Sequence, residues 1–237
     1  MLKEKRNARM RLSLMMALTF VTGALDAVGY LGLDRIFTGN MTGNIVILGM
    51  AAAGGNGLPV LGPALALVAF VLGAAVAGAV LKRRSSGWNV RVTVLLGIGT
   101  VMLSVAGVVL TQTDTHPEWI RVAMACAIAV QMGSQALIAR FLAVKDMTTV
   151  VVTSTLASLA GESFFGSGSR LWNRRFAAVA VLFAGATAGT GLMHLHLSVP
   201  VFVAAAITAA VTITGMSKWN LPEEATIQAP ELQTAKQ

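Results

Sequence analysis

The sequence predicts an all-α integral membrane protein, a bundle of six membrane-spanning helices. Hydrophobic residues make up 55% of the 237 residues, charged residues make up only 12%, and the mean hydropathy is +0.73. Soluble domains carry about 25% charged residues, so this composition excludes almost any water-soluble globular protein. The apolar residues are also gathered into runs of about 20 residues, which is the length a helix needs to cross the hydrocarbon core of a bilayer.

Six runs reach that length, and they lie at about 12–32, 60–81, 92–111, 122–139, 176–193 and 199–216. The first run follows basic residues, as the hydrophobic region of a signal peptide does. It is longer than such a region and no clear cleavage site follows it, so we expect a retained span. Residues 1–218 are expected to form a single transmembrane domain. The polar residues 219–237, which contain prolines and lack periodicity, predict a disordered cytoplasmic tail.

Two shorter segments, 38–53 and 148–160, are only partly apolar and are rich in Thr, Gly, Asn and Ser. The positive charges indicate whether these segments cross the membrane. With six spans and a cytoplasmic N-terminus, every Lys and Arg except Arg35 and Arg121 lies on the cytoplasmic side, as the positive-inside rule requires. With eight spans, Lys82 and its neighbours Arg83 and Arg84 would face the wrong side. We therefore expect six spans with both termini in the cytoplasm.

The two halves of the domain, about 1–116 and 117–218, share one pattern. Each has a long span, a short Thr-rich segment and two further spans, and one alignment places Thr38 on Thr149, Thr42 on Thr153 and Asn44 on Thr155. Since three crossings per half is an odd number, the second half enters the membrane from the opposite side. The sequence thus predicts a 3+3 inverted repeat in which two short broken or re-entrant helices approach the midplane from opposite faces.

The first short segment begins with the string TGNMTGN (residues 38–44), whose residue types recur at a spacing of four. On a helix, Gly39 and Gly43 would share one face, and Asn40 and Asn44 would project their amides in one direction. Two interpretations remain open. These residues either pack helices together, or their amides and hydroxyls line the path of a solute.

Asp26 is the one carboxylate that lies well inside a predicted span. A charge at the bilayer centre costs about 2.5–3.5 kcal/mol on insertion scales, so Asp26 is expected to face the bundle or water. It either couples transport to a proton or cation, or it only fixes helix packing. Gln131 and Gln135 occupy the corresponding region of the second half. The full set of solute-path candidates is Asp26, Thr38, Gly39, Asn40, Thr42, Gly43, Asn44, Gln135, Thr149, Thr153 and Thr155.

Small residues spaced by four also occur inside the spans. Ala74-x-x-x-Gly78 and Gly185-x-x-x-Gly189 are candidates for close helix–helix contact.

The string TGNMTGN after the first span, the string DMTTVVVTSTL (residues 146–156) after the fourth and the chain length together resemble the YoaK family of bacterial multi-pass membrane proteins. The resemblance covers roughly residues 10–218. It implies an integral protein of the bacterial inner membrane with about six helices. It implies no biochemical activity and no role for any residue.

The sequence predicts neither an enzyme nor a metal or cofactor site. It contains no phosphate-binding Gly-rich loop, no HExxH and no G-x-S-x-G. The net charge of +8 does not indicate nucleic-acid binding, because the basic residues lie between apolar runs without interleaved aromatic residues. The expected partners are the lipid bilayer and a small polar solute. Two functions remain open: a transporter or channel for a small polar or anionic solute, or a non-transporting membrane scaffold or partner-binding subunit.

Overall fold

The computed structural model describes residues 2–82, 87–112, 117–142 and 169–218, and the regular elements within these ranges are all α-helices. They are α1 (Leu2–Gly32), α2 (Met41–Ala52), α3 (Leu61–Leu81), α4 (Val90–Leu110), α5 (Glu118–Phe141), α7 (Ser169–Met193) and α8 (Ser198–Lys218). All of these except α2 are long and apolar enough to cross a membrane. The six-span helical bundle predicted from the sequence is therefore confirmed. The predicted tail, 219–237, lies outside the described residues.

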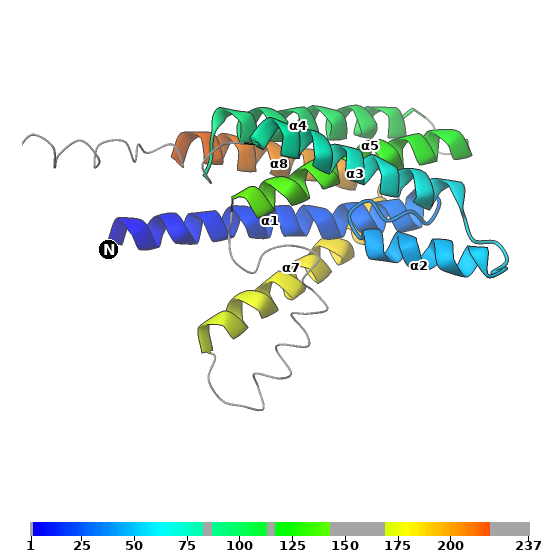
Figure 1. Cartoon of the computed structure of the whole chain (residues 1–237), viewed down its shortest axis with the longest axis horizontal. Coiled ribbons are helices and arrows are strands. Elements are labelled where there is room, and N and C mark those ends of the chain that lie inside the picture. Colours follow the sequence, from blue (N-terminus) through cyan, green and yellow to red (C-terminus); the bar gives the residue numbers. More distant parts are fainter. Residues whose placement is uncertain (1, 83–86, 113–116, 143–168, 219–237) are drawn as a thin grey trace, which may run out of the picture.

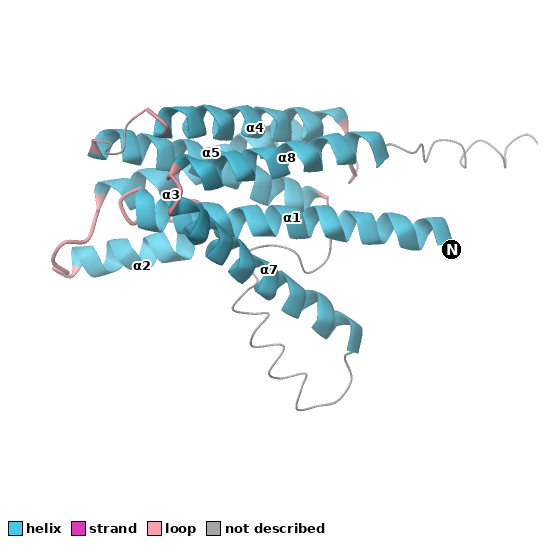
Figure 2. Ribbon diagram, turned by 180° about the vertical axis from the view of Figure 1, so that it is seen from behind, coloured by secondary structure: helices cyan, strands magenta, loops and turns pink. Residues whose placement is uncertain are grey.

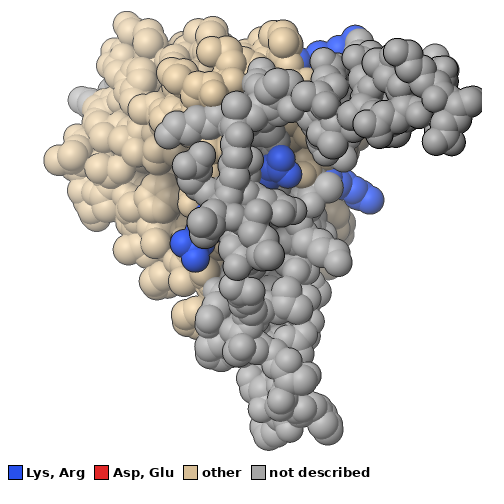
Figure 3. Space-filling model, turned by 90° about the vertical axis from the view of Figure 1, so that its left-hand side faces the viewer, with Lys and Arg blue, Asp and Glu red and all other residues tan. Residues whose placement is uncertain are grey.

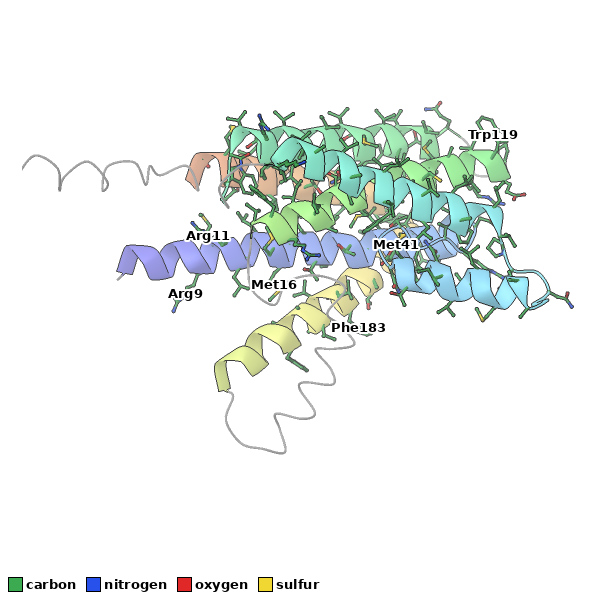
Figure 4. The ribbon with its side chains drawn as sticks, in the orientation of Figure 1. Arg9, Arg11, Met16, Met41, Trp119 and Phe183 are labelled. Carbon is green, nitrogen blue, oxygen red and sulfur yellow. The ribbon has the colours of Figure 1, made fainter. Side chains whose placement is uncertain are left out.

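The spans run side by side in a bundle, with α7 tilted away from the others (Figures 1 and 2). The N-terminus and the last turn of α8 lie at the same end of the bundle, as an even number of crossings requires (Figure 1). Arg9 and Arg11 are at this end, whereas the exposed indole of Trp119 is at the other end (Figure 4). Viewed from the N-terminal end, the described surface shows Lys and Arg side chains and no Asp or Glu (Figure 3).

The short helix α2 begins inside the bundle. After α1 ends at Gly32, the chain turns through Asp34 and Arg35, both with positive φ, and folds back along α1 until residues 38–40 contact Asp26. At a rise of about 1.5 Å per residue, Asp26 lies about 9 Å below the end of α1. From this depth α2 runs outward again beside α3 (Figure 1). The first short segment thus forms a re-entrant helix, while the second, 148–160, lies outside the described residues.

Among the described helices, the most extensive packing is in three pairs: α3 with α5, α1 with α7, and α4 with α8. In the first pair, two glycines bring the backbones into direct contact. A Cβ at Gly73 would overlap the carbonyl oxygen of Val130, and a Cβ at Gly133 would overlap the carbonyl oxygen of Phe70. On each helix the glycine lies three residues after the residue that provides the carbonyl: Gly73 follows Phe70 on α3, and Gly133 follows Val130 on α5.

The pair α1/α7 repeats this arrangement. A Cβ at Gly185 would overlap the carbonyl oxygen of Phe20, and a Cβ at Gly23 would overlap that of Leu182. Gly189 adds a further close contact, with its Cβ position 2.8 Å from the Cα of Ala24. The small-residue spacing at Gly185 and Gly189 therefore marks a real helix contact, as predicted.

The two crossings correspond to each other residue by residue. Exchanging the halves places Phe20 and Gly23 of α1 on Val130 and Gly133 of α5, and places Phe70 and Gly73 of α3 on Leu182 and Gly185 of α7. α1 and α5 run in opposite directions through the bundle (Figure 1). These are the contacts that an inverted repeat predicts. When the two halves are exchanged, α1 takes the place of α5 and α5 takes the place of α1. The contact between α1 and α5 is therefore unchanged by the exchange, and the pseudo-two-fold axis passes through it.

Candidate functional site

The carboxylate of Asp26 anchors the loop that precedes α2. Its Oδ1 accepts hydrogen bonds from three successive backbone N–H groups: those of Thr38 (2.9 Å), Gly39 (2.7 Å) and Asn40 (3.2 Å). The hydroxyl of Thr38 lies 3.4 Å from the same oxygen. A bend that exposes several N–H groups in a row is a favourable anion site, and here the protein's own carboxylate occupies it. Asp26 therefore holds the re-entrant loop against α1.

Asn44 fixes the same loop from the other side. Its Nδ2 donates to the carbonyl of Phe37 (2.7 Å), and its Oδ1 accepts from the N–H of Phe37 (2.9 Å). The side chain of Asn44 is fully buried. Gly43 lies next to it, and a Cβ there would come within 2.6 Å of the Phe37 ring. The amide of Asn44 and the absence of a side chain at Gly43 thus both serve the folding of this loop.

Thr38–Asn44 is not one continuous helix, so the shared faces that a helix would give these residues do not form. The helix begins only at Met41, because Asn40 is its N-cap and accepts a hydrogen bond from Gly43 N (3.2 Å) through its side chain. The amides of Asn40 and Asn44 consequently have different partners and do not project in one direction. An N-terminal cap is a preferred position for Asn, since its side-chain oxygen satisfies an N–H group that the first turn leaves free.

The two asparagines are expected to differ in their effect on stability. Asn40→Ala should cost about 1 kcal/mol, the usual effect of losing an N-cap. Asn44→Ala should cost about 2–4 kcal/mol, because it leaves two backbone groups of Phe37 without their partner inside the protein. Thermal unfolding of the purified variants in detergent measures both. Equal losses would show that the double hydrogen bond to Phe37 does not hold the loop.

The remaining candidates of the first half have distinct positions. Thr38 is fully buried beneath Asp26, and Gly39 lies against Thr22, with its Cβ position 3.0 Å from Thr22 Cγ2. Thr42 is exposed on the surface of α2. The candidates of the second half, Thr149, Thr153 and Thr155, lie outside the described residues.

The buried core of the bundle is divided into two apolar clusters at different depths. The first contains Leu25, Leu103, Met132 and Ala205, and the second contains Leu18, Leu96, Ile138 and Val211. Each set has one residue from each of α1, α4, α5 and α8. Between the clusters, α4 has Gly99, α5 has Gln135 and α8 has Thr208.

Buried polar side chains lie at this boundary or beside it, near the middle of the spans. We call Thr22, Gln131, Gln135 and Thr208 the central polar layer. The two threonine hydroxyls donate to carbonyls of their own helices, Thr22 to Leu18 (3.0 Å) and Thr208 to Ala204 (2.8 Å). Gln135 Nε2 joins α5 to α1, since it lies 3.3 Å from Leu18 O and 3.4 Å from Thr22 Oγ1. This bond lies on the α1/α5 contact that the pseudo-two-fold axis crosses.

Within the part of the chain that the structure describes, two amide atoms of the layer have no hydrogen-bond partner: Gln131 Nε2 and Gln135 Oε1. The residues are only 2% and 4% exposed, so neither side chain lies at the surface in this conformation. A buried polar atom left unpaired costs about 1–3 kcal/mol. The Gln131 amide lies directly on Gly99 of α4, where any side chain would overlap it. The absence of a side chain at Gly99 therefore accommodates the Gln131 amide, whose Nε2 is left without a hydrogen-bond partner.

A series of contacts connects the re-entrant loop to this layer, one of them through the methyl group of Thr22. Asn40 is exposed, Asp26 binds the backbone of residues 38–40, Gly39 lies against Thr22, and Thr22 contacts Gln135. Asp26, Thr38 and Gly39 are thus in direct contact, and Gln135 is linked to them through Thr22. Thr22, Gly99 and Thr208 were missed, although a polar or small residue at the centre of an apolar run is a signal that could have found them.

The fold defines the class of this protein, which is a multi-pass α-helical membrane protein with a polar layer near the centre of its spans. The chain belongs to the DUF1275 family, described as a protein of unknown function, whose family model matches residues 14–214. It is also similar to the UPF0700 transmembrane protein YoaK of Bacillus subtilis (strain 168), with 32% identity over 163 residues, covering 67% of this chain and 71% of that protein. The resemblance to the YoaK family is thereby confirmed. No solved structure matches the chain.

Proposed function

We propose that the protein is a transporter or channel for a small polar or anionic solute, and that the central polar layer is part of the solute path. The observation that carries the proposal is the pair of unpartnered amide atoms, Gln131 Nε2 and Gln135 Oε1, in the middle of membrane-spanning helices. Polar groups at this depth are costly and are typical of solute or ion pathways. In transporters built from inverted repeats, the binding site lies near the midplane at the repeat interface, which is the location of Gln135 here.

The proposal also gives the orientation of the protein in the membrane, and it involves no enzymatic reaction. We place the protein in the bacterial cytoplasmic membrane with both termini in the cytoplasm. This orientation puts the basic end seen in Figure 3 inside, in accord with the positive-inside rule, and opens the re-entrant loop to the outside. Asp26 keeps a structural role in this proposal, with coupling to a proton or cation as an additional function.

The second candidate function is a non-transporting scaffold or partner-binding subunit. The hydrogen bonds of Asp26 and Asn44 favour it, because both side chains are used to hold the loop. In that case Gln131 and Gln135 would only set the register of the helices. The two functions differ in one physical property: a solute path is reached by water, whereas a packing seam is dry.

Cysteine accessibility tests this difference. Cys126→Ser removes the one native thiol, and single cysteines are then introduced at Gln131 and Gln135. Ile128→Cys is the matched control, since it lies on the same helix, is 1% exposed and belongs to the first apolar cluster. We expect a small hydrophilic thiol reagent to label positions 131 and 135 and not 128. Asn40→Cys should react from the outside only.

Labelling at none of the buried positions in a folded protein would contradict transport and favour the scaffold. Labelling at 128 as fast as at 131 would indicate general loosening of the bundle, and the accessibility would then not support a path.

A further inference from the structure

We propose that the central polar layer binds a small uncharged molecule that has both a hydrogen-bond donor and an acceptor, such as a primary amide, urea or a polyol. This inference rests on the proposed function and narrows its solute from polar or anionic to neutral.

The groups that the layer offers set the chemistry of the ligand. Gln131 Nε2 is an unpaired donor and Gln135 Oε1 is an unpaired acceptor. The two residues are four apart on α5 and share a face, so their side chains start about 5–6 Å apart. One molecule that accepts from Gln131 and donates to Gln135 would satisfy both atoms.

The charges around the layer disfavour an anion. In the described parts of the six spans, every charged residue other than Asp26 lies in the first or last turn of its span. An anion in the layer would have no cation beside it and would lie one helical turn from the Asp26 carboxylate. Moving an anion into a medium of low polarity without a counter-charge is strongly unfavourable, whereas a neutral molecule needs only hydrogen bonds.

The packing around the layer limits the size of the ligand. Apolar side chains close it at both depths: Met132 and Ala205 on one side, and Ile138 and Val211 on the other. On the α4 side, the Gln131 amide itself fills the position beside Gly99, where a Cβ would overlap it. Only a molecule with a few non-hydrogen atoms is consistent with this environment.

Solute flux into proteoliposomes tests the inference, measured as swelling by stopped-flow light scattering. The neutral probes are formamide, urea and glycerol, and the anionic probes are formate and nitrate. We expect the full-length protein to raise the permeability to at least one neutral probe above that of protein-free liposomes and to leave the anions unchanged. Gln131→Leu and Gln135→Leu should each lower that flux about tenfold, since each removes one hydrogen bond to the solute.

Gln112→Leu is the matched control, because Gln112 is exposed at the end of α4, and its flux should equal that of the wild type. The selectivity of the wild type alone tests the inference even if a layer variant does not fold. Flux of nitrate or formate without neutral flux would overturn the inference and leave the proposed function standing. If no probe passes, the inference is wrong, and the labelling at position 131 shows whether transport is wrong as well.

Discussion

Gly73→Ala is expected to destabilise the protein by at least about 2 kcal/mol, even though alanine is the better helix former by about 1 kcal/mol. The reason is that the added methyl group would overlap the backbone carbonyl of Val130, which cannot move as a side chain can. Helices α3 and α5 would have to separate along their length. Thermal unfolding in detergent, followed by tryptophan fluorescence and by size-exclusion elution, measures the loss.

Gly97→Ala is the control for this variant. Gly97 is also in the middle of a spanning helix, but a Cβ there meets nothing within 4 Å, so its substitution should be neutral or slightly stabilising. Gly185 corresponds to Gly73 in the α1/α7 crossing, so Gly185→Ala is expected to lose a similar amount. If Gly73→Ala were as stable as Gly97→Ala, the close α3/α5 contact would be wrong. Unequal losses at 73 and 185 would contradict the equivalence of the two crossings.

Asp26→Ala is expected to cost about 2–5 kcal/mol and to release the re-entrant loop. The substitution removes the acceptor of three backbone N–H groups, and the N–H of the fully buried Thr38 would have no partner. Unfolding in detergent measures the stability, and limited proteolysis between Gly32 and Met41 measures the release of the loop.

Asp26→Asn separates hydrogen bonding from charge. It keeps an oxygen that can accept the same N–H groups, so we expect a smaller loss of stability than for alanine and a loop that stays protected from protease. A loss as large as that of Asp26→Ala would show that the negative charge, and not the acceptor, holds the loop. Unchanged folding together with unchanged solute flux in Asp26→Asn would remove the coupling role of this residue.

The spans could be predicted because a helix that crosses a membrane is recognised from the apolar composition and the length of its own segment. A run of about 20 apolar residues is sufficient to indicate a spanning helix whatever its neighbours are. The re-entrant position of α2 was also predictable, since an apolar segment interrupted by Thr, Gly and Asn is too short and too polar to cross.

The partners of the polar residues were not predictable in the same way. Asp26 binds backbone N–H groups, and because every residue except proline has one, the sequence does not show which of them a carboxylate contacts. The spacing of Asn40 and Asn44 suggested one helix face, yet spacing does not show where a helix begins. Gly185 and Gly189 were identified as packing residues, although only the three-dimensional structure shows that they contact α1.

The pairing of helices across the halves has a consequence for the biogenesis of the protein. α1 has its most extensive contact with α7, and α3 has its most extensive contact with α5. Each tight crossing therefore joins a helix made early by the ribosome to one made later. The first helices must enter the bilayer and remain there without their main partners until the second half has been translated. Assembly of the bundle is thus completed after insertion, because the most extensive contacts between the described helices join one half to the other.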